Sequence, residues 1–286
     1  MSLRRTLWET PPRDIVRKGL RRLLRNTSPD VEGLLRSPHC NSQRFYNFLA
    51  RYEAILARTN EWSPIRFQDK TVLEVGCGPL LGFGPLAIFR GCRLYMAIEP
   101  AFEAELTYHP RLAERYFAGV HRDLTAVYGP GPGLTEFLLM LRERVQIVPL
   151  AVAGVTGGVQ ADIVLSNSAL EHFSPLPESI AALTRLATAD ARVVHLVDFG
   201  NHHPTPSPFS GMYSVLPSEY RRLHGEGINL ARPPDLLRAF QDAGACVALQ
   251  PVYAVRESFD EPILSWWRDR YSDDDLFLKV ALVFSA

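Results

Sequence analysis

A short apolar segment that ends in two closely spaced glycines constrains this chain most. Residues 71–82 read TVLEVGCGPLLG, so an apolar run passes directly into Gly76, Cys77 and Gly78. A continuous apolar run of this length is typical of a strand that is buried on both faces of a parallel sheet. Glycine tolerates positive φ angles and lets a ligand approach the backbone closely. The segment therefore predicts an α/β fold with a ligand-binding turn after its first strand.

Two kinds of nucleotide ligand fit such a turn. A dinucleotide fingerprint is G-x-G-x-x-G, in which the third glycine packs helix against strand beneath a pyrophosphate. Here Leu81 stands at the third position, and glycine follows one residue later at Gly82. Glu74, two residues before the first glycine, is awkward beside a pyrophosphate but suits a cationic ligand. The pattern resembles motif I of class I S-adenosylmethionine (SAM)-dependent methyltransferases, E/D-x-G-x-G.

A second acid lies at the end of the next predicted strand. That strand covers residues 93–98 and is followed by Glu99. An acid about twenty residues beyond the glycines is placed to accept hydrogen bonds from ribose hydroxyls. Two acids at the ends of successive strands favour a nucleotide-type ligand more strongly than the glycine pair alone.

A third strand is expected over residues 145–150. Ala151 and Val152 at its exit would lie near an adenine ring. Many methyltransferases place an acidic residue there, and this chain has none, so we expect backbone groups to hold most of the adenine.

The fourth strand, predicted over residues 161–167, carries a second resemblance. The phrase D-I-V-L-S-N-S-A-L-E-H is similar to motif IV of small-molecule methyltransferases. Asp162 opens this strand, whereas ligands of open α/β sheets gather at strand carboxyl ends. Asn167, Ser168 and His172 are at the correct end, and Asp162 is not.

The resemblance implies a fold and a domain plan. It implies a Rossmann-like, seven-stranded, mostly parallel sheet with helices on both faces and an antiparallel last strand. We expect the methyltransferase domain over 66–286, with insertions at 101–146 and 199–231, after a basic and helical N-terminal extension over 1–65. Later phrases, H-L-V-D-F-G-N-H-H among them, are similar to a bacterial subgroup, some members of which accompany glycan or natural-product pathways.

The resemblance also implies which residues contact SAM. They follow the carboxyl ends of the strands: Glu74, Gly76, Cys77, Gly78, Glu99, Pro100, Ala151, Val152, Asn167 and Ser168.

Methyl transfer from a sulfonium requires an aligned acceptor and the exclusion of water. A hydroxyl acceptor benefits from a general base, typically histidine, whereas an amine needs little more than alignment. The candidate catalytic residues are His172 after the fourth strand and His202 after the fifth, with Asp198 placed to orient a histidine. His203 is a candidate substrate contact. Each histidine also fits a packing or exposed position.

A metal centre and a nucleic-acid substrate are not expected. Asp198, His202 and His203 offer ligands for a divalent ion, but adjacent histidines rarely point the same way. The N-P-P-Y-type motif of base methyltransferases is absent, and the formal net charge is zero. Four scattered cysteines without a C-x-x-C pair suit a reducing cytoplasm, which is the predicted location.

The first thirty residues are locally basic, with apolar residues at roughly helical spacing. Such a segment can lie on an anionic membrane or dock on its own domain. Peripheral membrane contact through residues 1–26 is therefore one hypothesis.

The leading interpretation is a SAM-dependent methyltransferase that acts on oxygen or nitrogen of a small molecule or sugar. An NAD-binding oxidoreductase is the first alternative, and Leu81 counts against it. A non-catalytic SAM-binding partner protein is the second, and the intact Glu74, Gly76, Gly78 and Glu99 count against it.

Overall fold

The structure, a computed structural model, describes residues 30–59, 63–158, 160–225, 227–257 and 259–285. The basic segment that the sequence singles out therefore lies almost wholly outside the described residues, and its membrane contact stays a prediction. Over the described ranges, no helix combines the length and the apolar character that crossing a bilayer requires.

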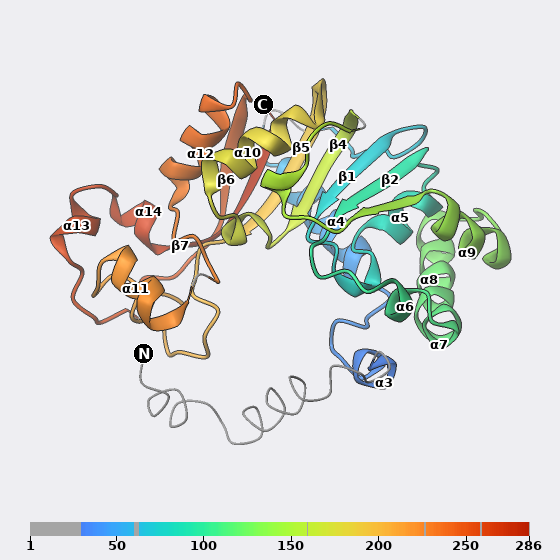
Figure 1. Cartoon of the computed structure of the whole chain (residues 1–286), viewed down its shortest axis with the longest axis horizontal. Helices are drawn as coiled ribbons and strands as arrows, with labels where there is room; N and C mark the ends of the chain where they lie inside the picture. The colour runs from blue at the N-terminus through green and yellow to red at the C-terminus, as the bar shows by residue number, and fades with distance from the viewer. Residues whose placement is uncertain (1–29, 60–62, 159, 226, 258, 286) are drawn as a thin grey trace.

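One seven-stranded sheet forms the centre of the molecule, in the order β3-β2-β1-β4-β5-β7-β6 (Figure 1). The strands are β1 (Thr71–Val75), β2 (Leu94–Ile98), β3 (Val145–Val148), β4 (Ala161–Asn167), β5 (Ala187–Asp198), β6 (Val247–Ala254) and β7 (Leu278–Ser285). Strands β1 to β5 pair in parallel, and β7 runs antiparallel between β5 and β6. The predicted mostly parallel sheet with an antiparallel last strand is confirmed.

Helices cover both faces of the sheet, as the resemblance implies (Figure 1). One face packs against α4 (Arg44–Leu56), α5 (Gly84–Phe89), α8 (Ala118–Tyr128) and α9 (Leu134–Glu143). The other face packs against α10 (Leu176–Arg185) and α12 (Pro233–Asp242). Within β1, Val72 belongs to the first core, whereas Leu73 and Val75 belong to the second. This two-sided burial explains why β1 reads as a continuous apolar run.

The predicted insertion at 101–146 extends the first core. After α6 (Ala104–Thr107) and α7 (Pro110–Leu112), a π-helical turn η2 (Ala113–Phe117) continues directly into α8. Phe137 of α9 and Leu124 of α8 are buried in the core that contains α5. Helices α8 and α9 therefore pack through their buried faces against the first core, next to α5.

The predicted insertion at 199–231 belongs to a third, smaller core. It contains α11 (Pro217–His224) and packs against α13 (Ser265–Arg268) and α14 (Asp273–Phe277), which lie beside it in Figure 1. Tyr213 lies at the centre, with its ring centroid 5.1 Å from that of the fully buried Trp267. The sequence did not indicate that the segment before β7 would complete this insertion.

Candidate functional site

The candidate site lies where the strand order changes direction. From β1 the chain crosses to β2 on one side, and from β4 it crosses to β5 on the other. In open α/β sheets, ligands bind outside the carboxyl ends of the strands at such a switch point. Val75 pairs with Ile98 of β2 and with Ser166 of β4, so the residues that follow these three lie along one edge.

The turn after β1 requires glycine at two positions. Gly76 and Gly78 have φ angles of 76° and 62°, in the left-handed region. A Cβ atom at Gly76 would lie only 3.0 Å from the Cβ of Ala169, whereas one at Gly78 would meet nothing within 4 Å. Gly76 is therefore confined by the protein itself, and Gly78 borders open space at the edge where a ligand would bind.

Glu99 at the end of β2 holds this turn in place. Its Oε2 accepts a hydrogen bond from the Gly78 N–H at 2.9 Å, and its Oε1 accepts one from the Ala101 N–H at 3.1 Å. The side chain is half-buried, and the neighbouring Pro100 is exposed. A carboxylate has about four lone-pair positions, so Glu99 keeps the capacity to accept further hydrogen bonds from ligand hydroxyls.

Glu74 lies inside the loop and is only 1% exposed. Its Oε2 accepts hydrogen bonds from the Phe83 N–H at 2.7 Å and from the Tyr95 hydroxyl at 2.7 Å. A Cβ atom at Gly82 would collide with the Glu74 carboxyl group, which explains the late glycine of the pattern. Glu74 therefore fixes the loop from within.

The structure corrects the prediction that Glu74 is an anion that suits a cationic ligand. Burial raises the pKa of Glu74 to about 8, so the carboxyl is largely protonated at neutral pH. The hydrogen bonds agree, because the single proton of the Tyr95 hydroxyl faces two acceptors, Glu74 Oε2 and the Leu81 carbonyl, the latter at 2.9 Å. When Glu74 is protonated, its own proton can lie between Glu74 and the Tyr95 oxygen, which leaves the Tyr95 proton for the Leu81 carbonyl. Attraction of a cationic ligand by Glu74 is thus not supported by this geometry.

A pH-dependent stability follows from the buried Glu74. In the unfolded chain the group titrates near its ordinary value of 4.5, so between about 4.5 and 8 only the folded chain keeps the proton. The free energy of unfolding should then fall as pH rises across this window, by at most about 1.4 kcal/mol per pH unit. The loss is complete above the folded pKa.

Glu74→Gln removes this titration, so its stability should decline less than that of the wild type. Between about pH 5.5 and 8 we expect the difference to reach about 3 kcal/mol, as read from urea unfolding at both pH values. Parallel pH profiles of the two proteins would show that the Glu74 carboxyl is ionised in the folded chain.

The exit of β3 offers apolar surface. Leu150 is 49% exposed, and Ala151 is also exposed. Val152, in contrast, is buried in the core beneath, within a 3-10 turn, η3 (Val152–Gly154). Cys77 is likewise buried. Of these four, only Leu150 and Ala151 present side chains to a ligand, and Val152 and Cys77 can contribute only their backbone groups.

Asn167 and Ser168 leave β4 at the same edge, where α4 meets them. The hydroxyl of Tyr52, a fully buried residue of α4, donates to Asn167 Oδ1 at 2.9 Å. Ser168 has a φ angle of 53°, which is uncommon outside glycine. Sequence reasoning missed Tyr52 as a residue of the site, because its hydrogen-bond partner lies 115 residues away.

Asp162 lies at the opposite end of β4, as the sequence predicts. Its Oδ2 accepts a hydrogen bond from the Thr71 N–H at 2.7 Å, and its Oδ1 lies 3.8 Å from Lys70 Nζ. It therefore joins β4 to the start of β1 and takes no part in the site.

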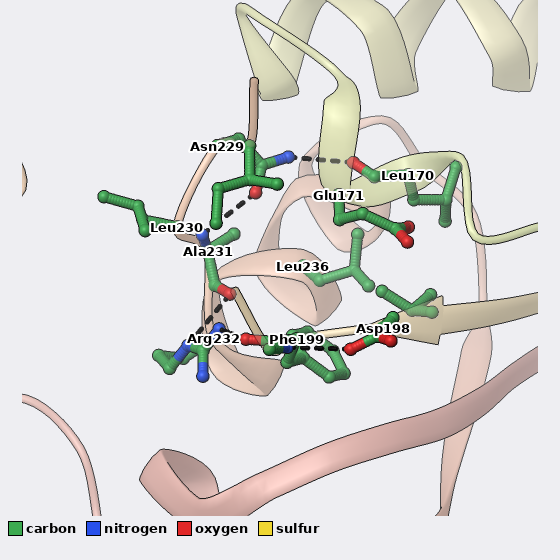
Figure 2. Close-up of a pocket in the computed structure, with 12 residues that line it drawn as sticks. Leu170, Glu171, Asp198, Phe199, Asn229, Leu230, Ala231, Arg232 and Leu236 are labelled. Carbon is green, nitrogen blue, oxygen red and sulfur yellow. Dashed lines mark hydrogen bonds between the residues drawn. The ribbon is translucent and has the colours of Figure 1, made fainter. Parts of the chain in front are cut away.

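The candidate catalytic residues are brought together only in part. The rings of His172, in the 3-10 turn η4 (Leu170–His172), and His202 are 4.9 Å apart, edge to face. Glu171, which the sequence did not single out, lies beside them, with its Oε1 3.9 Å from His202 Nε2. Its carboxyl group lines a pocket together with Asp198 and Arg232 (Figure 2).

Asp198 was predicted to orient a histidine and His203 to contact the substrate, but neither residue lies in this group. Asp198 Oδ2 pairs with Lys279 Nζ at 2.6 Å, and Oδ1 accepts from the Gly200 N–H at 2.9 Å. The Asp198 carboxylate is thus held by β7 and by its own loop, and among the described residues no hydrogen bond joins it to His202. The ring of His203 lies 5.0 Å from that of His224, so the adjacent histidines diverge as expected.

Comparisons with known proteins leave the family open. No protein-family model matches the chain, and no curated protein matches it. Among solved structures, an O-methyltransferase family protein from Burkholderia thailandensis matches at a TM-score of 0.43 and 12% identity, over 85% of this chain and 56% of that one. The chain thus spans little more than half the length of that protein.

Two further structures match over most of both chains. One is a methyltransferase in complex with the Haloferax volcanii activator Trm112, with a TM-score of 0.47, 11% identity and coverage of 91% and 99%. The other is a geranyl diphosphate methyltransferase in complex with SAM, with a TM-score of 0.46, 16% identity and coverage of 83% and 84%. At these scores and identities the likeness assigns no activity to this chain.

Proposed function

We propose that this protein is a SAM-dependent methyltransferase that acts on oxygen or nitrogen of a small-molecule or sugar acceptor. The observation that carries the proposal is the hydrogen bond from the Gly78 N–H to Glu99 Oε2, 2.9 Å long, at the switch point of the sheet. It joins a glycine turn to a carboxylate at the end of the next strand, which is the arrangement that a bound adenosine uses. SAM itself supplies an electrophilic methyl group.

The residues at this edge fit that ligand. Gly78 leaves open space beside the turn, and Glu99 retains acceptor capacity for ribose hydroxyls. Exposed Leu150 and Ala151 offer an apolar surface to the adenine. We assign methyl transfer to residues 66–286, with 1–65 as an extension whose helix α4 packs against the loop after the turn.

The acceptor is proposed to bind beside His172 and His202. A hydroxyl acceptor must lose a proton as the new bond forms, and the imidazole of a histidine is a suitable group to accept it. His172 Nδ1 is hydrogen-bonded to the Gly227 carbonyl, so Nδ1 carries the proton and Nε2 is left to interact with an acceptor. An amine acceptor would need only alignment. Glycan or natural-product pathways remain part of this proposal.

Glu99→Ala tests the cofactor side. Removing a charged hydrogen-bond acceptor costs about 1.5–3 kcal/mol, so the Kd for SAM should rise about 10- to 150-fold in calorimetric titration. Glu99→Gln keeps the shape of the side chain, so its Kd for SAM should lie between those of the wild type and Glu99→Ala.

The matched control is Glu105→Ala, which removes an exposed acid of α6 a few residues away. Its SAM affinity should equal that of the wild type. Equal affinity in Glu99→Ala and Glu105→Ala would remove the support for SAM binding at this edge.

A further inference from the structure

We propose that Glu171, His172 and His202 form a binding site for a divalent transition-metal ion of the zinc class. One ligand atom from each of the three residues lies within 4.8 Å of the others. The sequence offered a different set, Asp198, His202 and His203, and argued against it. Only His202 is common to both sets, because in the structure Asp198 pairs with Lys279 and His203 packs beside His224.

Glu171 is the strongest observation for this site. The residue is 4% exposed, and across the described residues neither carboxyl oxygen has a partner within hydrogen-bond geometry. A buried carboxyl group without partners is costly, so such groups are usually paired or bound to a metal. The nearby ammonium group of Lys279 is already paired with Asp198, and the closest cationic candidate, His202 Nε2, is 3.9 Å away. A bound cation would satisfy the Glu171 oxygens.

His172 is held in the manner of a metal ligand. Its Nδ1 is hydrogen-bonded to the Gly227 carbonyl, which fixes the ring and leaves the Nε2 lone pair free. Histidines that ligate metals almost always donate their second ring N–H to a carbonyl or carboxylate in this way. The His202 ring stands edge to face with it, at an interplanar angle of 67°.

The donor set indicates the class of ion. Two imidazole nitrogens and one carboxylate suit Zn²⁺, Co²⁺, Ni²⁺ or Fe²⁺, whereas Mg²⁺ and Ca²⁺ prefer oxygen ligands. In a tetrahedral site, metal–ligand bonds of about 2.1 Å place the ligand atoms about 3.4 Å apart, so the exposed His172 and His202 would move closer to Glu171 when the ion binds. Three protein ligands leave a coordination position open.

An open position next to the pocket of Glu171 and Asp198 gives the ion a role. In the metal-loaded protein it would bind the acceptor oxygen and lower the pKa of its hydroxyl, whereas in the metal-free protein His172 Nε2 is free to act as the general base. This role rests on the proposed function, whereas metal binding itself does not.

Cobalt titration of the full-length protein, after removal of metal with a chelator, tests the site directly. We expect one equivalent of Co²⁺ to bind with the absorption bands of a nitrogen–oxygen site, without thiolate charge transfer, and Zn²⁺ to displace it. Glu171→Gln, His172→Ala and His202→Ala should each weaken binding about tenfold or more. His203→Ala, the adjacent histidine outside the cluster, should bind as the wild type does.

Two outcomes would overturn the proposal: no stoichiometric Co²⁺ binding by the wild type, or an equal loss of affinity in His203→Ala and the three variants. His202 is exposed, so His202→Ala should fold, and circular dichroism of each variant checks this. SAM titration in metal-free buffer separates this proposal from the proposed function. Metal binding without SAM binding would sustain the site and refute methyl transfer, and the converse result would do the opposite.

Discussion

His172→Ala should reduce methyl transfer to a hydroxyl acceptor by about 10²–10⁴-fold, the usual contribution of general acid–base catalysis. The reason is the position of the ring at the end of β4, 4.9 Å from His202 and fixed through its Nδ1 by the Gly227 carbonyl. The Kd for SAM should stay nearly unchanged, because the side chain makes no contact with the Glu99 turn. Transfer of labelled methyl groups to a panel of hydroxyl- and amine-bearing acceptors, sugars included, measures the effect.

His203→Ala provides the matched control, because its ring packs beside His224 and away from His172. It should retain activity. A His172→Ala variant that loses SAM binding instead of turnover would identify His172 as a scaffold residue. Full activity on a hydroxyl acceptor would exclude His172 from the proton transfer altogether.

Arg232→Ala should lower the free energy of unfolding by about 3–5 kcal/mol, the range for removing one partner of a buried charged network. Arg232 is 1% exposed. It donates to the Phe199 carbonyl at 2.5 Å, to the Tyr213 hydroxyl at 2.6 Å and to the Ala231 carbonyl at 3.0 Å. These bonds tie the start of α12 to the loop after β5 and to the third core, so the truncation leaves buried acceptors unpaired and a cavity.

Arg238→Ala removes an exposed arginine of the same helix and should change the stability by less than about 0.5 kcal/mol. Urea denaturation of both variants gives the comparison. Equal stability of the two would mean that the third core is held independently of Arg232. His202 lies in the loop after β5 that Arg232 holds through the Phe199 carbonyl. Arg232→Ala should therefore also weaken cobalt binding, whereas Arg238→Ala should not.

The sequence predicted the sheet well because the physics of its strands is local. The bounds of β1 and β4 agree with the predictions, since strands buried on both faces are mostly apolar along their length. The glycine turn could also be predicted from the sequence, because Gly76 and Gly78 adopt backbone angles that other residues avoid. Glu99 followed from its place after the second strand, where the structure has it bonded to the turn.

The remaining site depended on contacts that the sequence does not display. Glu74 looked like a free anion, but Tyr95 and the loop bury it. Asp198 looked like a partner for a histidine, but the antiparallel pairing of β5 with β7 brings Lys279 to it from 81 residues away. Glu171 was not singled out at all, because only the fold makes it buried and unpartnered among the described residues.

The third core was missed for a similar reason. Its aromatic residues come from two segments separated by β6, and neither segment shows a regular apolar period of useful length. Tyr213 and Trp267 meet only because α13 and α14 fold back against the 199–231 insertion before β7 enters the sheet. The insertion is therefore anchored over the end of the sheet next to Asp198 and the candidate acceptor site, which a reading of isolated segments could not establish.

Calorimetric titration of the wild-type protein with SAM, its demethylated product S-adenosylhomocysteine, and NAD decides which ligand binds at the Glu99 turn. We expect saturable binding of SAM and of the product with one site per chain, affinity loss in Glu99→Ala, and no measurable binding of NAD. Saturable binding of NAD, with no heat from SAM or its product, would contradict this expectation and make the edge of β1, β2 and β4 a dinucleotide site.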